Sequence, residues 1–159
     1  MPDSSNKPVI FISYARKDRR WLEFVQDHLA PAESHGHFEI WDDDRIEGGA
    51  DWKAEIDQAL STCAAFVLLV SRFSLSSRFI LKEEVKTALE AHWDRGVRIY
   101  PIIVSDCDKE AVSWLMRMNI RPRGARPLAR LPTAKRDEVM ASLAAELRQL
   151  IAKAPASQA

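Results

Sequence analysis

Two adjacent carboxylates, Glu83 and Glu84, have the best placement for chemistry in this chain. They lie in a segment of helical periodicity, and at about 3.6 residues per turn its apolar stripe borders Glu84, whereas Glu83 points away. A carboxylate beside such a stripe can be partly desolvated and held in a cleft. The pattern favours Glu84 as a catalytic residue. The alternative is that both glutamates are surface charges paired with Lys82 or Lys86.

A basic run after the first apolar segment offers groups for an anionic or aromatic ligand. Arg16 can hold a phosphate through its planar guanidinium or stack on a base, and it can equally be a solvated member of the run 16–20. Tyr14 and Trp52 can present aromatic faces to a base. For Trp52 the helical spacing to later apolar residues favours a core anchor.

An acidic, glycine-containing segment covers residues 42–51. We interpret its three consecutive aspartates as part of a solvated loop, not a metal site, because no second carboxylate or histidine cluster lies nearby in the sequence. Arg45, Ile46 and Glu47 form the expected loop tip, where an apolar residue between opposite charges suits contact with another subunit. Gly49 and the glycine before it allow a tight turn.

Composition excludes several classes of function. The 23 lysines and arginines balance 23 aspartates and glutamates, so no overall field attracts nucleic acid or an anionic membrane. Cys63 and Cys107 lack the spacing of a zinc site or a secreted disulfide framework, which favours a reducing, cytoplasmic location. The longest apolar run, 64–70, is too short to cross a bilayer, and the amino terminus does not resemble a signal peptide. Neither common nucleotide fingerprint, GxGxxG or the P-loop, occurs.

Short apolar runs of strand type alternate with segments of helical periodicity. We expect strands at 9–13, 38–41, 64–70 and 97–104, and a short fifth strand at the sheet edge within 126–131. Pro101 is unusual in a central strand because proline cannot donate to a ladder. Pro31 should end the first helix. The later helices should start at Asp51 as N-cap, extend from about 78 to 93, and carry an apolar stripe over 139–151.

This alternation predicts an α/β fold, a flavodoxin-like doubly wound sheet of five parallel strands with helices on both faces. Ligands of such sheets bind beyond the carboxyl ends of the strands, near the point where the strand order reverses. Tyr14, Arg16, the 42–51 loop and the segment from Ser71 to Phe79 all belong to that edge. Their convergence is the physical basis for predicting a binding site there.

Three segments in this order resemble the TIR (Toll/interleukin-1 receptor) domain family. They are FISYARKD at 11–18, WDDDRIEGGADW at 41–52 and SSRFILKEEVKTALE at 76–90. The compact style is similar to that of bacterial TIR proteins, which commonly act in immune defence or as effectors.

The resemblance also sets the expected domain limits. We expect a flexible amino terminus at 1–7, a TIR domain at 8–152, and a flexible tail or linker at 153–159 that leads to a further domain or simply frays.

In this family the third segment carries the glutamate of those members that cleave NAD. The glutamate usually precedes an apolar residue, which implies Glu84 before Val85, although the aromatic residue often found four positions earlier is replaced by Ile80. The implied activity is an NAD glycohydrolase that releases nicotinamide and gives ADP-ribose or a cyclic ADP-ribose, with NAD as substrate and no cofactor or metal. The implied substrate contacts are Tyr14, Arg16, Arg45, Gly49, Trp52, Ser71 and Phe79.

The resemblance further implies self-association through contacts between TIR domains. In the family's enzymes the second segment, called the BB loop, completes the site of a neighbouring subunit, so Arg45, Ile46 and Glu47 would be interface residues. The alternative is a non-catalytic signalling scaffold, which would use this tip and leave Glu84 idle. A phospho-acceptor receiver domain shares the sheet order but needs acidic residues where this chain has Ser13 and Ser71, and we reject it.

Overall fold

Each strand of the structure lies within an apolar run that the sequence predicts to be extended. The computed structural model describes residues 7–42, 52–77, 80, 84–112 and 114–153. The strands are β1 (Val9–Ser13), β2 (Glu39–Trp41), β3 (Ala65–Val70) and β4 (Arg98–Ile103). The α-helices are α1 (Arg19–Ser34), α2 (Trp52–Thr62), α3 (Arg72–Leu75), α4 (Val85–Arg95) and α5 (Thr133–Lys153). Short 3-10 helices are η2 (Arg16–Asp18), η5 (Lys109–Ala111), η6 (Leu115–Arg117) and η7 (Leu128–Arg130).

The four strands form one parallel sheet in the order β2-β1-β3-β4. Phe11 of β1 lies opposite Trp41 of β2 on one side and Phe66 of β3 on the other. The chain therefore starts in the middle of the sheet and builds outward in both directions, which confirms the doubly wound, flavodoxin-like arrangement. The strand order reverses beside β1, and the carboxyl ends of β1 and β3 meet there.

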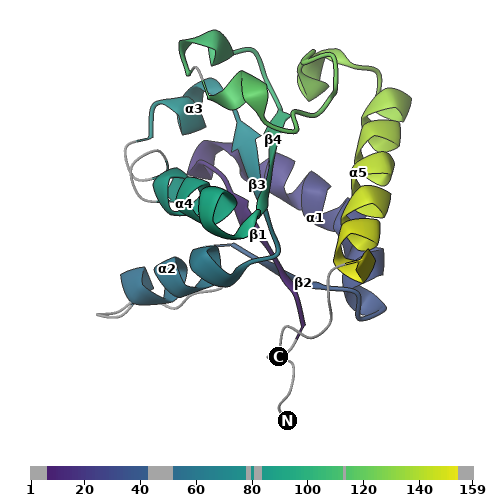
Figure 1. Cartoon of the computed structure of the whole chain (residues 1–159). Helices are drawn as coiled ribbons and strands as arrows, with labels where there is room; N and C mark the ends of the chain where they lie inside the picture. Colours follow the sequence, from purple (N-terminus) through teal and green to yellow (C-terminus); the bar gives the residue numbers. More distant parts are fainter. Residues whose placement is uncertain (1–6, 43–51, 78–79, 81–83, 113, 154–159) are drawn as a thin grey trace.

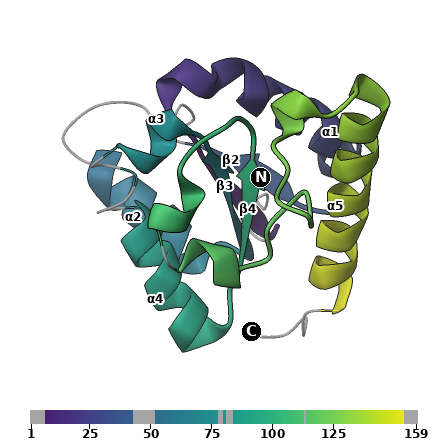
Figure 2. The same ribbon diagram turned by 90° about the horizontal axis from the view of Figure 1, so that it is seen from above.

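Helices cover both faces of this sheet, with α1 and α5 on one face and α2 and α4 on the other (Figure 1; Figure 2 gives the view from above). Alternate strand residues divide between the two layers: Ile10 and Ile12 pack under α1 and α5, whereas Phe11 and Phe66 pack under α2 and α4. The Phe11 and Phe66 rings stack at 6.2 Å between centroids. Each large side chain buried in this way contributes about 1.5–3 kcal/mol relative to exposure.

The predicted fifth strand at 126–131 is wrong. Leu128–Arg130 is the 3-10 helix η7, in which the Leu131 N–H donates to the Leu128 carbonyl at 3.0 Å. Arg136 of α5 also donates to the carbonyls of Leu128 and Ala129, at 2.7 and 3.0 Å. The place beside β4 is taken by residues 119–121, where Arg121 forms a single parallel bridge with Ile102. Four strands are thus present among the described residues, and a short edge segment replaces the fifth.

Pro101 is accommodated because its ring nitrogen faces this edge segment and not β3. Its carbonyl accepts from the Arg121 N–H at 2.8 Å, and a residue of a parallel strand directs its N–H and C=O to the same side. In a regular ladder residue 101 would also donate to the Asn119 carbonyl. The Arg121 guanidinium donates to that carbonyl instead, at 3.2 Å. A side chain therefore replaces the donor that proline lacks.

One helix limit differs from the prediction. Helix α1 continues through Pro31 to Ser34, because a proline in the last turn removes a single helical hydrogen bond and its carbonyl still accepts from His35 at 3.1 Å. The regular helix α4 begins at Val85, and both Ile80 and Glu84 before it have π-helical hydrogen bonding; the predicted start near 78 lies outside the described residues. It ends as predicted at Gly96, which has a φ of 77°.

Candidate functional site

Two serines mark the carboxyl ends of the central strands. Ser13 is the last residue of β1, and Ser71 directly follows β3. Both are buried, and each hydroxyl donates to a buried carboxylate, Ser13 to Glu84 and Ser71 to Asp18. The carboxyl ends of these two neighbouring strands, near α3 in Figure 1, therefore hold two serine–carboxylate pairs.

Glu84 is the more deeply buried of the two carboxylates, with 1% of its surface exposed. Strand alternation places Ser13 on the same face of β1 as Phe11, the face that α4 covers, so the Ser13 hydroxyl meets Glu84 Oε1. Ile80 and Val85, on either side of Glu84 in sequence, are also buried in that layer. Burying a carboxylate costs free energy, and the hydrogen bond from Ser13 offsets part of that cost. The neighbouring Glu83 lies outside the described residues.

Asp18 is a buried carboxylate that the sequence analysis did not identify. It is 3% exposed and accepts a hydrogen bond from the Ser71 hydroxyl at 2.5 Å. Burial raises the pKa of the Asp18 carboxyl above its ordinary value, while the Ser71 hydrogen bond and the charge of Arg20 act in the opposite direction. Asp18 is the sole acid in a basic run, which made it look solvated. The presence of a single acidic residue among four basic ones was the one feature of the sequence that could have singled out Asp18.

Ser71 was predicted to contact substrate, and the structure shows its hydroxyl fully engaged within the protein. Besides donating to Asp18, it accepts from the backbone N–H groups of Phe73 and Ser74 at 3.1 and 3.2 Å. The Ser74 hydroxyl accepts from the Ser71 N–H at 3.0 Å and completes a capping box at the start of α3. Ser71 thus fixes the loop after β3 to the loop after β1.

Tyr14 and Arg16 lie at the predicted edge but do not converge on Glu84. Tyr14 directly follows Ser13, the last residue of β1. Because successive side chains of an extended chain point to opposite faces, its ring lies in the other layer and is buried beneath α1 and α5. Its hydroxyl lies 3.5 Å from Arg19 Nη1. Arg16 is exposed at the start of η2.

A basic rim, defined here as Arg16, Lys17 and Arg72, borders the same edge. The Lys17 ammonium and the Arg72 guanidinium both lie over the ring of Phe73, at 5.2 and 4.7 Å from its centroid. The Asp18–Ser71 hydrogen bond holds the two segments that carry these cations together. Sequence analysis missed Lys17 and Arg72 as a pair because they are far apart along the chain.

Several predicted residues cannot be placed. Arg45, Ile46, Glu47 and Gly49 lie outside the described residues, as do Asp51 and Phe79, and of Trp52 only the backbone at the start of α2 is described. The interpretation of the three aspartates as solvated is wrong for Asp42, which is buried and accepts from Gln26 at 3.0 Å; the other two lie outside the described residues. In the described ranges no three histidine, cysteine or acidic side chains gather as a metal site would require.

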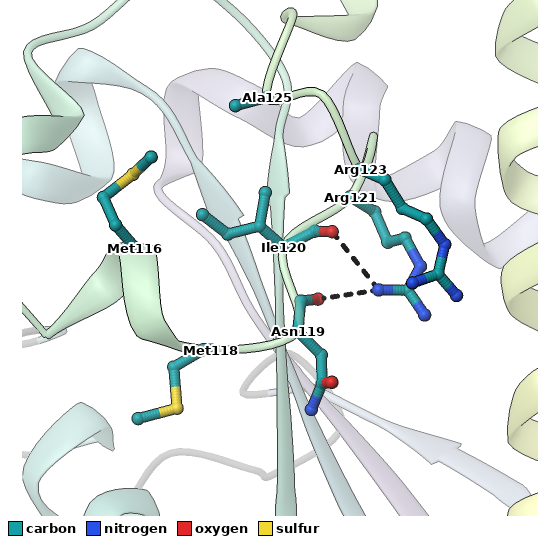
Figure 3. Close-up of a pocket in the computed structure, with 7 residues that line it drawn as sticks. All are labelled: Met116, Met118, Asn119, Ile120, Arg121, Arg123 and Ala125. Carbon is teal, nitrogen blue, oxygen red and sulfur yellow. Dashed lines mark hydrogen bonds between the residues drawn. The ribbon is translucent and has the colours of Figure 1, made fainter.

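A hollow of about 260 Å³ lies beside the edge segment next to β4 (Figure 3). Its two arginines, Arg121 and Arg123, look available for an anion, but Arg121 donates to the carbonyls of Asn119 and Ile120 and pairs with Glu146. Burial opposes ionisation of Glu146, yet these contacts outweigh it and lower the pKa of that carboxyl. Both arginines thus share the single carboxylate of Glu146, and the hollow contains none of the predicted site residues.

None of the helices within the described ranges combines the length and the apolar character that crossing a membrane requires.

Comparison with known proteins agrees with the fold. A family model described as TIR domain matches residues 10–131. The uncharacterized protein y4lF of Sinorhizobium fredii (strain NBRC 101917 / NGR234) is 28% identical over 142 residues, which cover 89% of this chain and 43% of that protein. The chain thus spans less than half the length of that relative.

Two solved TIR domains have the same fold. The TIR domain of the Toll-related receptor TRR-2 from Hydra magnipapillata matches with a TM-score of 0.59 and 17% identity, over 87% of this chain and 97% of that one. The TIR domains of the activated Roq1 resistosome, which recognizes the effector XopQ, match with a TM-score of 0.53 and 20% identity, over 87% and 84%. Because the family model spans most of the sequence and the fold agrees, the chain belongs to the TIR domain family.

Proposed function

We propose that this TIR domain is an NAD glycohydrolase, which cleaves the bond between nicotinamide and ribose and is activated by self-association. The observation that carries the proposal is Glu84, a carboxylate held beneath the surface at the edge where parallel sheets bind ligands. Sequence resemblance to the glutamate of the family's NAD-cleaving members adds to it.

One such carboxylate can be sufficient to catalyse this reaction. The bond between the nicotinamide nitrogen and ribose C1′ breaks with its electron pair moving to the nitrogen, which neutralises the pyridinium, so no acid is required for the leaving group. Positive charge then develops on the ribose, and a nearby carboxylate stabilises it most effectively where water is excluded. Water adds to C1′ and releases a proton, giving ADP-ribose; attack by the adenine would give a cyclic product instead.

The basic rim supports a dinucleotide substrate. The exposed side chains of Arg16, Lys17 and Arg72 bring three positive charges to the edge beside Ser13, although the whole chain has no net charge. Arginine donates to two phosphate oxygens at once, and lysine supplies a compact charge. A pyrophosphate bound on this rim would direct the attached ribose toward the carboxyl ends of β1 and β3.

The burial of Glu84 accounts for the proposed dependence on self-association. With 1% of its surface exposed, Glu84 cannot reach a ribose in the arrangement described here. The hydrogen bond between Ser13 and Glu84 must therefore open before turnover, and association of subunits is the proposed cause.

Nicotinamide release tests the proposal directly. Purified protein at high concentration is incubated with NAD, and free nicotinamide is measured by chromatography. We expect Glu84→Gln to lower release by roughly 100-fold or more with the fold intact. Glu90→Gln, which changes an exposed glutamate of α4, and Glu83→Gln should both retain activity.

The same burial favours a second candidate, a non-catalytic TIR module that acts by binding other TIR domains. In such a module the Ser13–Glu84 pair would be a structural contact only. This candidate replaces the first if the wild-type protein associates, by light scattering, yet releases no nicotinamide at any concentration.

A further inference from the structure

A second hollow lies on the other side of the sheet from α4, where α1 and α5 run side by side (Figures 1 and 2). It measures about 440 Å³ and is open to solvent. Arg20, Trp21 and Phe24 line it from α1, Ala129 from η7, and Arg136 from α5. Hollows of this size hold small organic ligands in many proteins.

The wall of this hollow is aromatic. Trp21 and Phe24 meet edge to face, with 5.8 Å between ring centroids and an interplanar angle of 89°. Trp21 is 9% exposed, so its indole is anchored in the core and presents only a part of its surface to the hollow. Because packing already fixes these two rings, they can contact a flat ligand without a further loss of side-chain entropy.

Two guanidinium groups lie over the Trp21 ring. The Arg20 and Arg136 guanidinium carbons are 5.9 and 5.4 Å from its centroid. The aromatic surface left for a ligand is therefore mainly that of Phe24, which is partly buried. Arg136 is held in place by hydrogen bonds from Nε to the Leu128 carbonyl and from Nη2 to the Ala129 carbonyl. One cation of the hollow is therefore positioned in advance, which lowers the cost of binding an anion.

No acidic side chain lines the hollow in the part of the chain that the structure describes. The carboxylates nearest in sequence to the two arginines are engaged elsewhere. Glu23 pairs with Arg19 at 3.6 Å, and Asp137 pairs with His28 at 2.9 Å. Asp18 is buried against Ser71, and its charge interacts with that of Arg20. The described residues that line the hollow nevertheless carry two positive charges and no negative one.

We propose that this hollow binds a nucleoside monophosphate, with the phosphate between Arg20 and Arg136 and the base against Trp21 and Phe24. The Arg20 guanidinium can donate to two phosphate oxygens, and Arg136, whose Nε and Nη2 are held by backbone carbonyls, can donate from Nη1. The Phe24 ring, with the exposed part of Trp21, matches a flat base. This site is separate from the edge that holds Glu84, and it stands whether or not the chain cleaves NAD.

Calorimetric titration of the purified protein with AMP, adenosine and inorganic phosphate tests the proposal. We expect saturable binding of AMP, and binding about tenfold weaker or worse for adenosine and for phosphate, because each lacks one half of the recognised chemistry. Equal binding of AMP and phosphate would show an unspecific anion site, and equal binding of AMP and adenosine a purely apolar one. Either result, or no AMP binding, overturns the proposal.

Variants then locate the site. Arg20→Gln should weaken AMP binding by about tenfold or more, whereas Arg148→Gln, which removes an exposed arginine of α5 away from the hollow, should leave it unchanged. Arg136→Lys, which keeps the charge but loses the hydrogen bonds that hold the cation against Leu128 and Ala129, should weaken AMP binding without unfolding the protein. If Arg72→Gln abolishes AMP binding and Arg20→Gln does not, the nucleotide lies on the basic rim and the proposed site is wrong.

Discussion

The Ser13 hydroxyl donates a hydrogen bond to Glu84, 71 residues further along the chain, and both side chains are buried. The contact joins the end of β1 to the start of α4. It therefore links the stability of the fold to the position of the residue on which the proposed chemistry depends.

Ser13→Ala should destabilise the protein by about 1–3 kcal/mol, because a buried carboxylate oxygen loses its donor. In a domain of this size that lowers Tm by roughly 2–4 °C per kcal/mol, which circular dichroism can follow. Ser61→Ala, which removes an exposed hydroxyl bonded only to its own helix, should have little effect. The same Ser13→Ala change should cost less in a Glu84→Gln background, because a neutral amide oxygen is a weaker acceptor than a carboxylate; equal costs would show that the charge of Glu84 does not strengthen the contact.

Asp18 should make stability depend on pH. Its pKa in the folded protein is raised from 3.8 mainly by burial, so the folded state holds the proton more tightly than the unfolded chain. The stability that this contributes is present below about pH 3.8 and is lost as pH rises through the folded pKa. Asp18→Asn cannot ionise, so its Tm relative to the wild type should increase as pH rises through that window.

Ser71→Ala provides the second arm of that experiment. The Ser71 hydrogen bond lowers the pKa of Asp18, so its removal should raise that pKa further and steepen the loss of stability with pH. A Tm difference between Asp18→Asn and wild type that is the same at every pH would show that Asp18 does not titrate differently on folding.

The basic rim should act on substrate binding more than on the chemical step. Lys17→Gln combined with Arg72→Gln should raise KM for NAD by about tenfold and leave kcat nearly unchanged, because contacts to phosphate are made equally in the ground and transition states. Initial rates against NAD concentration measure both constants. Arg148→Gln is the matched loss of an exposed charge. A fall in kcat at constant KM would mean that the rim does not hold the phosphates.

Substitutions at the expected loop tip and at Arg16 should affect assembly and turnover differently. Ile46→Asp should abolish both association and nicotinamide release, because an unpaired charge would enter an apolar contact. Arg16→Ala should reduce only turnover. Light scattering measured beside nicotinamide release distinguishes the two. If Ile46→Asp protein still assembles and remains active, the interface lies elsewhere.

The sequence predicted well those features that depend on local periodicity. β1 is found at the predicted residues, and the helical stripe correctly placed Glu84 beside the apolar layer. Periodicity could not show that Glu84 is buried, since that depends on Ser13, which strand alternation turns toward α4. The position of Glu84 was therefore predictable, but its hydrogen-bond partner was not.

Features set by contacts between distant segments were missed. Asp18 appeared to be one more charge in a solvated run until Ser71 was found against it. The segment 126–131 was predicted to be extended because its own sequence does not reveal the hydrogen bonds that two of its carbonyls accept from Arg136. Lys17 and Arg72 form a pair only because both lie over Phe73.

The replacement of a ladder donor at Pro101 has a consequence for how copies of this domain can meet. Residues 119 and 121 direct their backbone N–H groups toward β4, so the backbone N–H and C=O of Ile120 face away from the sheet, while its side chain is buried. Its N–H donates to the Met118 carbonyl, and its own carbonyl accepts from Arg121. The outermost backbone groups are therefore already satisfied and cannot template a strand from a second chain. If the domain self-associates as proposed, a continuous sheet that passes from one subunit to the next through Ile120 is disfavoured, and any contact at this side of the molecule would use side chains.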